Sequence, residues 1–383
     1  MPAFAHCVIS FSGKYLGVFV GPCAHECFWD GLPRRLLERA DDVRALTSGL
    51  TMKIRSFGAY CTSLLAFRLQ FCPPSPSICS SYRQASQRIT ATPWNSLPHS
   101  VLTALKELSF PFEIVDLERL SLASRARVAA TSSSFRTSWD RYSLAWQSDD
   151  RLLLPPFPAW RRGSCLMHLH TALGHFQARP CAVPLLAKHP RDLQRQLHAI
   201  LRADPLPRRN LAAALLRRIC KRWVAAEPAA IVGAIFSFFG SQSGGQTLKL
   251  PLRIRMAVLL TAFDAWPTKS RMQERLHPCR FGCGSGSRDI IDHLLVCPKV
   301  QHFGVEHFGI NYADIEGQVL ERLIAALPLG AQGCKVAIYI DLVLAAYRSA
   351  IHNSNGDVVA AMVSRLKHLL LLRPRLRTLF PAL

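Results

Sequence analysis

The sequence predicts a mainly α-helical protein that starts with a short β-hairpin, and three observations favour this fold class. Apolar residues recur every three or four positions through most of the chain, which is the period of an amphipathic helix. β-Branched and aromatic residues dominate only within residues 1–21. The 25 prolines and 21 glycines interrupt the apolar pattern repeatedly, so many breaks between helices are expected.

The hairpin is expected within residues 1–21. Both Cys7–Phe11 and Lys14–Gly21 are rich in residues that favour strands, and Ser12-Gly13 supplies a turn between them. This is the one part of the chain for which the sequence predicts strands.

Residues 22–131 change to the helical period and are interpreted as a helical bundle. Two helices are expected within residues 33–71, with a break near Ser48-Gly49. Two further helices are expected over residues 98–109 and 114–130.

The composition changes after this bundle. Residues 132–165 are rich in Ser, Thr and Pro and are interpreted as a linker. Residues 166–270 return to the helical period and are interpreted as a helical connector. Within the connector, the apolar run 229–239 is too short to span a bilayer and is expected to be a buried helix. Residues 306–383 are expected to form a C-terminal helical region.

One helix of the connector is expected to carry a basic face. Its apolar stripe includes Leu211, Leu215 and Ile219, and the side chains opposite that stripe are Arg217, Arg218 and Lys221. For any single helix, the simpler interpretation is a solvated charged face over a core helix.

Three cysteines and one histidine lie close together in the segment 271–305. They are Cys279, Cys283, His293 and Cys297, with the spacing C-x3-C-x9-H-x3-C. This is a ligand set that a structural, tetrahedral Zn²⁺ takes. A short helix is expected to present His293 and Cys297 on one face and to end at Pro298. The alternative is a chance grouping of buried thiols and a surface histidine.

The charge balance indicates a polyanionic partner. Lys and Arg number 47 against 25 acidic residues, which gives a net charge of +22. Nucleic acid is the first candidate and an anionic membrane surface the second. The 13 cysteines are odd in number and scattered along the chain, which indicates mostly reduced thiols. An intracellular, nuclear location is therefore expected.

Several short stretches occur in an informative order. Lys14–Gly21 is similar to a KYLG strand, Tyr60–Phe71 to a thumb segment, and Trp266–Gln273 to a W-x-T-x-x-R lead-in. The cysteine and histidine cluster follows, and its end, His293–Pro298, reads H-L-L-V-C-P. In this order the stretches resemble the C-terminal part of non-LTR (LINE-like) retrotransposon reverse transcriptases, which ends in a CCHC zinc knuckle. The family commonly has C-x2-C and H-x4-C, so both spacings here differ by one residue.

The resemblance implies roles for the segments. Residues 1–21 would be the end of a palm, residues 22–131 a thumb-like domain and residues 271–305 the zinc knuckle. RNA or DNA is the implied partner, Zn²⁺ the implied structural cofactor, and no small-molecule substrate is implied. The candidate nucleic-acid contacts are Arg34, Arg35, Lys53, Arg55, Arg217, Arg218, Lys221, Arg280, Phe281, Arg288 and Lys299. Phe281 would either stack on an unpaired base or fill the metal loop as a hydrophobic plug.

The resemblance also bears on catalysis. In the family, the carboxylates that bind Mg²⁺ lie upstream of the KYLG strand, and here no acidic residue precedes Lys14. Asp41-Asp42, Asp149-Asp150 and Asp314 all follow that strand and lack a partner in family order. Neither polymerase activity nor bound Mg²⁺ is therefore expected.

Three other interpretations stay open. In the first, the chain is an eroded retroelement remnant with no selected activity, and the irregular knuckle spacing favours this interpretation. In the second, it is a mis-started fragment of an active RNA-directed DNA polymerase, which a Tyr-x-Asp-Asp hairpin encoded just upstream would support. In the third, it is a basic protein of a membrane surface, which only the charge favours.

Overall fold

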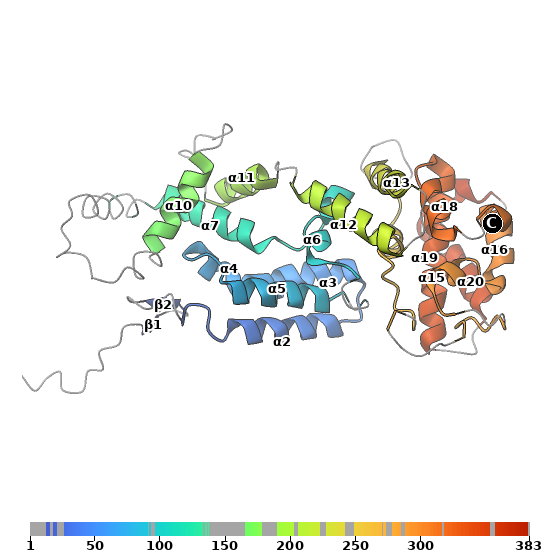
Figure 1. Ribbon diagram of the computed structural model, residues 1–383, viewed down its shortest axis with the longest axis horizontal. Coiled ribbons are helices and arrows are strands. Elements are labelled where there is room, and N and C mark those ends of the chain that lie inside the picture. Colours follow the sequence, from blue (N-terminus) through green and yellow to red (C-terminus); the bar gives the residue numbers. More distant parts are fainter. Residues whose placement is uncertain are drawn as a thin grey trace, which may run out of the picture. The chain divides into compact units, whose positions relative to one another are not determined.

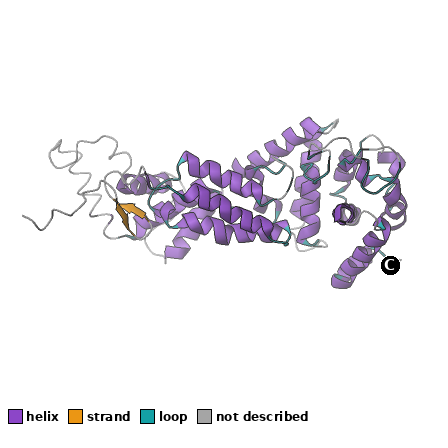
Figure 2. Ribbon diagram, turned by 90° about the horizontal axis from the view of Figure 1, so that it is seen from below, coloured by secondary structure: helices purple, strands orange, loops and turns teal. Residues whose placement is uncertain are grey.

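The chain is mainly helical, which confirms that part of the expected fold class (Figure 2). The computed structural model describes residues 13–15, 18–20, 27–90, 92, 96–132, 135, 137, 165–177, 190–202, 206–222, 227–241, 249–269, 271–272, 278–284, 288–315, 318–352 and 357–381. Within these ranges, no helix is long and apolar enough to cross a membrane.

Two short strands lie near the start of the chain. β1 (Gly13–Tyr15) and β2 (Val18–Val20) pair antiparallel, with Lys14 opposite Phe19. The turn expected at Ser12-Gly13 does not separate these strands, because Gly13 is itself the first residue of β1. The other expected strand, Cys7–Phe11, lies outside the described residues.

The chain divides into two compact units, and both are built from segments that are discontinuous in sequence. Unit 1 comprises Met1–Leu46, Ser56–Ile89 and Ile114–Pro205. Unit 2 comprises Thr47–Arg55, Thr90–Glu113 and Leu206–Leu383. Neither unit corresponds to one consecutive range of the sequence. Nearly all of the expected linker, 132–165, lies outside the described residues.

Unit 1 is a helical bundle (Figure 1). Its described helical elements are α2 (Leu32–Ala45), η1 (Gly58–Thr62), α4 (Ser63–Ala66), η2 (Arg68–Gln70), α5 (Pro76–Arg88), α7 (Leu117–Thr131), α10 (Cys165–Gln177) and α11 (Pro190–Arg202). The helix α2 packs against α5, and α7 packs against both α10 and α11. Small residues of α7, Ala123 and Ala126, are fully buried against Phe176 and Leu197, which lets the three helices approach closely.

Capping residues explain where two of these helices begin. The Ser75 hydroxyl accepts from the backbone N–H of Ile78, and Pro76 follows as the first residue of α5. Asp116 accepts from the N–H of Arg119 at 2.9 Å and starts α7. The helix α3 (Leu50–Phe57) begins after the predicted break at Ser48-Gly49, which confirms that break.

Unit 2 holds most of α3 together with the remaining helical elements. They are α6 (His99–Leu102), η3 (Leu105–Leu108), α12 (Leu206–Arg222), α13 (Pro228–Ser241), α14 (Leu252–Ala262), α15 (Ile291–Leu295), α16 (Pro298–Phe308), α17 (Tyr312–Ile315), α18 (Val319–Ala326), α19 (Gly330–His352), α20 (Val358–Leu372) and η4 (Pro374–Leu379). The single helix expected over 98–109 is two shorter elements, α6 and η3. The apolar run 229–239 lies in α13, so its prediction as a helix is confirmed. The helix buries one face, with Ile231, Ile235 and Phe238, whereas Ala229, Gly233 and Ser237 are exposed.

The helix α19 is the centre of unit 2. It contacts α14, α15, α16, α18 and α20, and the labels of α15, α18 and α20 lie beside it in Figure 1. Its residues Val336–Leu344 are all buried, so the helix is apolar on every side over this stretch. One buried residue within it, Asp341, is charged. The segment that carries the cysteine and histidine cluster packs on this helix through α15 and α16.

Candidate metal centre

The four predicted ligands come together in unit 2. The ligand atoms of Cys279, Cys283, His293 and Cys297 all lie within 4.8 Å of one another. The Sγ atoms of Cys279 and Cys297 are 3.7 Å apart, and Cys283 Sγ is 3.4 Å from His293 Nε2. A tetrahedral Zn²⁺ with bonds of about 2.3 Å to sulfur and 2.0 Å to nitrogen has ligand-to-ligand edges of about 3.5–3.8 Å. The cluster could therefore bind a metal ion with little movement of its side chains.

The cysteines of the cluster are free thiols. A disulfide between Cys279 and Cys297 would need a sulfur separation of about 2.05 Å, which is far shorter than the 3.7 Å observed. Cys279 and Cys297 are buried, whereas Cys283 and His293 are half-buried. The cluster thus has one side in the core and one side nearer to solvent.

The first pair of ligands is held by a tight turn. The N–H of Gly282 donates to the carbonyl oxygen of Cys279 at 3.0 Å. Gly282 and Gly284 have φ angles of 64° and 72°, a region that residues with a Cβ rarely adopt. An isolated antiparallel bridge between Pro278 and Arg288 joins the two ends of this loop. The turn thus requires glycine on each side of Cys283.

The second pair lies on two successive helices rather than on one. His293 belongs to α15, which ends at Leu295, and Cys297 is the residue that precedes α16. The expectation of a single helix that carries both ligands and stops at Pro298 is therefore wrong. Pro298 begins a helix instead, because proline is well tolerated at the first helical position, where its missing N–H costs nothing.

The two buried thiols lie within hydrogen-bond distance of each other, with their Sγ atoms 3.7 Å apart. A hydrogen bond from Cys297 lowers the pKa of Cys279 to about 5, and the backbone N–H of Phe281 also favours the thiolate, against the effect of burial. The hydrogen bond to Cys279 raises the pKa of Cys297, and burial raises it further. Metal binding would release the thiol protons, since thiolates are the species that coordinate.

A buried carboxylate supports the segment between the two ligand pairs. Asp289 is 1% exposed, and its Oδ2 accepts from the N–H of Lys269 at 2.9 Å and from the Tyr347 hydroxyl at 2.8 Å. The edge of the Phe281 ring packs on Tyr347, with ring centroids 6.4 Å apart. The central helix α19 therefore contacts the cluster segment through Tyr347, and also through Tyr339, whose hydroxyl donates to the carbonyl oxygen of Leu295 at 2.7 Å. No sequence signal pairs Asp289 with Tyr347, although the tyrosines at 339 and 347 share one face of α19.

The residues of the W-x-T-x-x-R stretch have packing roles. Trp266 and Thr268 are fully buried, and the Thr268 hydroxyl accepts from the N–H of Arg271 at 3.4 Å. The Arg271 guanidinium lies 3.3 Å from Asp264 Oδ2 and donates to the Ser96 hydroxyl at 3.0 Å. These contacts connect the stretch to neighbouring segments of unit 2. The backbone N–H of the adjacent Lys269 donates to the carboxylate of Asp289.

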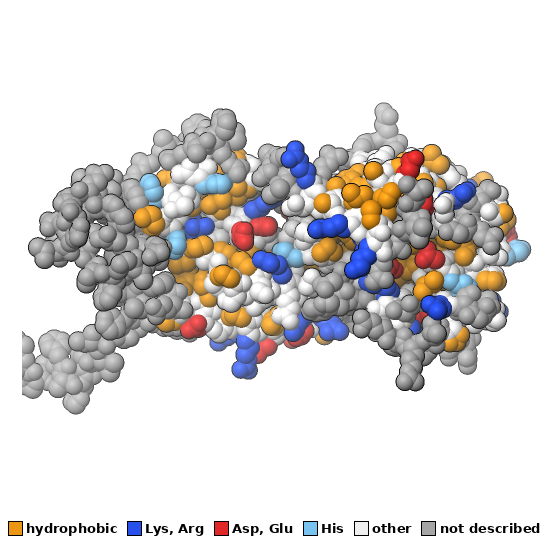
Figure 3. Space-filling view, viewed as in Figure 1, with side chains coloured by type: hydrophobic (Ala, Val, Ile, Leu, Met, Phe, Trp, Pro, Cys, Tyr) orange, Lys and Arg blue, Asp and Glu red, His pale blue; other side chains and the backbone are white. Residues whose placement is uncertain are grey.

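The expected nucleic-acid contacts are divided between the units. Arg34 and Arg35 lie on α2 in unit 1, and the other candidates lie in unit 2. The exposed candidates are Arg34, Arg35, Arg55, Arg217, Lys221, Arg288 and Lys299. On the face drawn in Figure 3, the described Lys and Arg side chains lie in separate small groups among hydrophobic and neutral side chains.

Several candidates make contacts within the protein. Phe281 is 6% exposed and packs on Tyr347, which favours the hydrophobic plug over a base-stacking role. Arg218 Nε donates to the carbonyl oxygen of Phe263 at 2.7 Å. Arg34 pairs with Glu38 at 2.8 Å. In addition, Arg55 lies over the ring of Phe112, and both Lys53 and Arg280 are half-buried.

Comparison with protein-family models, with curated proteins and with solved structures finds no match. The resemblance of the short stretches to non-LTR reverse transcriptases therefore stays a prediction from sequence. Function has to be inferred from the residues and the geometry of this chain alone.

Proposed function

We propose that the chain is a nucleic-acid-binding module organised by a structural zinc ion. It would correspond to the thumb, connector and zinc knuckle of a non-LTR reverse transcriptase, without a polymerase active site of its own. The observation that supports this most is the convergence of four Cys and His ligand atoms within 4.8 Å in a chain of net charge +22.

The number of ligands favours a structural role for the ion. Three cysteines and one histidine complete a tetrahedral shell, which leaves no open position for a water molecule or a substrate. Zinc binding would stabilise the segment by about 10 kcal/mol, because folding and coordination are coupled in such small sites. In the described residues of 278–300, regular helical structure is limited to the short α15 and the start of α16, so the ion would contribute to the order of this segment.

Cations next to the ligands give the zinc segment its affinity for phosphate. The backbone of Arg288 forms a β-bridge with that of Pro278, the residue before Cys279, and Lys299 lies two positions after Cys297. Both cationic side chains are exposed. On α12, Arg217 and Lys221 are also exposed and lie one turn apart. Contacts of this kind neutralise backbone phosphates, so they provide affinity without sequence preference.

The test is nucleic-acid binding by the full chain over a series of salt concentrations. Fluorescence anisotropy with labelled single-stranded and duplex oligonucleotides should show a dissociation constant that rises steeply with salt. The double variant Arg288→Gln, Lys299→Gln should reduce the slope of log K against log salt by about two. Removal of zinc with a chelator should weaken binding, and added zinc should restore it.

The matched control for these substitutions is Arg34→Gln. Arg34 is exposed like Arg288 but is already paired with Glu38, so its loss should change the slope less. Binding that persists undiminished at roughly 0.5 M salt would contradict the proposal, because an electrostatic contact to phosphates weakens as counterions compete. Equal binding before and after zinc removal would contradict the organising role of the ion.

A further inference from the structure

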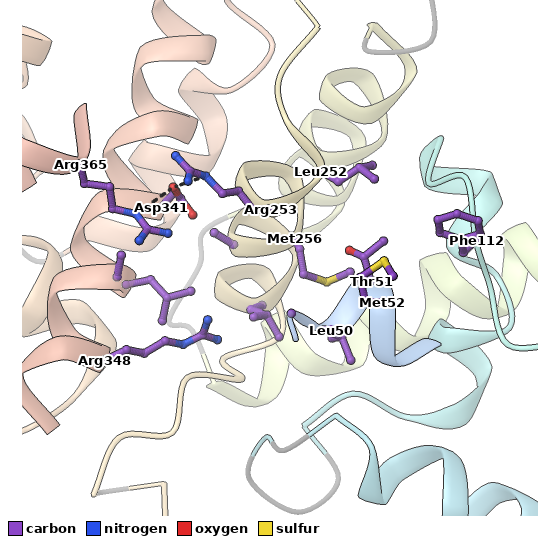
Figure 4. Close-up of a pocket in the computed structure, with 15 residues that line it drawn as sticks. Leu50, Thr51, Met52, Phe112, Leu252, Arg253, Met256, Asp341, Arg348 and Arg365 are labelled. Carbon is purple, nitrogen blue, oxygen red and sulfur yellow. Dashed lines mark ion pairs between the residues drawn. The ribbon is translucent and has the colours of Figure 1, made fainter. Parts of the chain in front are cut away.

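A pocket with one polar end and one apolar end lies in unit 2. Its volume is about 570 Å³, and its walls come from α14, α19, α20 and the start of α3 (Figure 4). The residues at the polar end are Arg253, Asp341, Arg348 and Arg365. The apolar end is formed by Leu50, Met52, Leu252, Met256 and Phe112. The zinc-ligand candidates do not line this pocket.

Two guanidinium groups flank one carboxylate at the polar end, and a third, that of Arg348, lies farther along the pocket wall. Arg253 Nε lies 3.4 Å and Arg365 Nε 3.8 Å from Oδ2 of Asp341, which is 5% exposed. Figure 4 shows these two arginines on either side of Asp341, while Arg348 extends toward the same space from another turn of α19. One carboxylate balances only one of the three positive charges. The pocket therefore has a positive excess at this end.

Two of the guanidinium groups, those of Arg253 and Arg365, have buried N–H donors that the described residues do not satisfy. Although they are shielded from solvent, Arg253 Nε and Nη2 and Arg365 Nε have no hydrogen-bond partner among the described residues, and neither has Asp341 Oδ2. The separations of 3.4 and 3.8 Å are ion pairs without hydrogen bonds. Buried donors without partners are costly, so their presence beside an open pocket indicates a place for a bound acceptor.

Neutralisation of Asp341 alone does not account for the cluster. Burial lowers the pKa of both Arg253 and Arg348, and Arg365 lowers each of them further by charge repulsion, while Asp341 acts in the opposite direction. The guanidinium groups thus repel one another in a site that holds a single carboxylate. A second anion in the pocket would relieve this repulsion and accept the unpaired N–H groups.

The apolar end indicates that the anion carries an organic part. Met52 is 49% exposed, so its apolar side chain is accessible to a ligand at this end of the pocket. Two methionines, Met52 and Met256, and the ring of Phe112 offer polarisable and flat surfaces of the kind that pack on planar heterocycles. A phosphate ion alone would leave this end unfilled.

We propose that this pocket binds a nucleotide, with the phosphate between Arg253, Arg348 and Arg365 and the base against Met52 and Met256. The nucleotide is either free or one unit of a nucleic-acid strand, since the phosphate ester is the same in both. This site goes beyond the zinc-dependent binding proposed above and does not depend on it.

The test is titration calorimetry of the zinc-loaded full chain with inorganic phosphate and with adenosine 5′-monophosphate. Saturable binding of both is expected, with the nucleotide binding more tightly because it also fills the apolar end. Arg348→Gln and Arg365→Gln should each weaken binding of both probes by about tenfold or more, since each removes a charged hydrogen-bond donor. The matched control is Arg322→Gln, an exposed arginine of α18 that does not line the pocket, and it should change neither affinity.

Two further variants separate the parts of the pocket. Asp341→Asn should tighten binding of both probes, because the carboxylate competes with the ligand for the same guanidinium groups. Met52→Gln should weaken binding of the nucleotide and leave binding of inorganic phosphate unchanged. If the arginines serve only to neutralise Asp341, then Asp341→Asn will lower stability and neither probe will bind.

An oligonucleotide arm identifies the source of the ligand. If a short single strand displaces adenosine 5′-monophosphate, and if Arg348→Gln weakens binding of that strand, the pocket is a site for one unit of a strand. A strand that binds without displacing the nucleotide marks it as a site for a free nucleotide. No saturable binding of either small probe by protein that retains zinc and binds oligonucleotides would overturn this inference alone. The inference would also be overturned if Arg348→Gln and Arg365→Gln bound both probes as tightly as Arg322→Gln does.

Discussion

The hydroxyl of Tyr347 donates a 2.8 Å hydrogen bond to the carboxylate of Asp289, which is almost fully buried. This bond joins the central helix α19 to the segment between the two pairs of candidate metal ligands. Because the other oxygen of Asp289 has no hydrogen-bond partner in the described part of the chain, the carboxylate depends on Tyr347 and on the N–H of Lys269.

Tyr347→Phe is expected to destabilise unit 2. The substitution keeps the ring that packs on Phe281 but leaves a buried carboxylate with one donor fewer, so the free energy of unfolding should fall by about 1–3 kcal/mol. Denaturant unfolding of the zinc-loaded protein measures the change. The control is Tyr60→Phe, since the exposed Tyr60 hydroxyl lies 3.5 Å from Asp42 and should contribute little. Equal effects of both variants would argue against the role given to Asp289.

Gly282→Ala is expected to weaken the turn between the first two ligands. A Cβ at this position meets no atom within 4 Å, so the cost comes from the backbone angle of 64° and should be about 1–2 kcal/mol. The control is Gly174→Ala in α10, where a Cβ also meets nothing and alanine should stabilise the helix by about 0.5–1 kcal/mol. Thermal unfolding measures both, and a neutral result at Gly282 would contradict the turn geometry.

Neighbouring arginines of α12 are expected to behave differently. Arg217 is exposed, so Arg217→Gln should reduce the salt slope of nucleic-acid binding by about one and leave stability unchanged. Arg218 donates to the Phe263 carbonyl, so Arg218→Gln should lower the free energy of unfolding by about 1–3 kcal/mol. Anisotropy and denaturant unfolding of the two variants form a matched pair. The reverse assignment of effects would show that the solvated face of α12 is not the one described.

Asp341 is expected to give unfolding a specific pH dependence. Burial raises its pKa from the ordinary value of 3.8, although Arg253, Arg365 and Arg348 act to lower it. A carboxyl group whose pKa is higher in the folded state favours folding below its unfolded pKa, and that contribution is lost as pH rises through the folded pKa. The wild type should therefore lose stability relative to Asp341→Asn as pH increases above 3.8. A difference that stays constant across the acid range would contradict this.

Features that depend on the local pattern of residues could be predicted from the sequence. The break at Ser48-Gly49 and the helix over the apolar run 229–239 follow from residue type and apolar period, and the four ligands follow from their chemistry and spacing. The place of Pro298 could not be predicted, because proline after a helical stretch can end one helix or begin the next. Only the packing of α15 and α16 on α19 decides between these outcomes.

Long-range contacts account for the rest. Tyr347 and Asp289 are 58 positions apart, and Arg218 and Phe263 are 45 positions apart, so periodicity carries no information about either pair. The difference between Arg217 and Arg218 is likewise invisible from a helical wheel that places both on the basic face. Asp341 did offer a signal, since a charge within the apolar stretch Val336–Leu344 indicates buried cations nearby.

The most direct test is zinc K-edge X-ray absorption on the purified full chain, together with its metal content. One zinc ion per chain is expected, with about three sulfur ligands near 2.3 Å and one nitrogen ligand near 2.0 Å. Cys297→Ser should lower the metal content, whereas Cys220→Ser, at an exposed cysteine of α12, should not. A chain that folds fully without zinc, or a zinc shell without sulfur, would contradict the account.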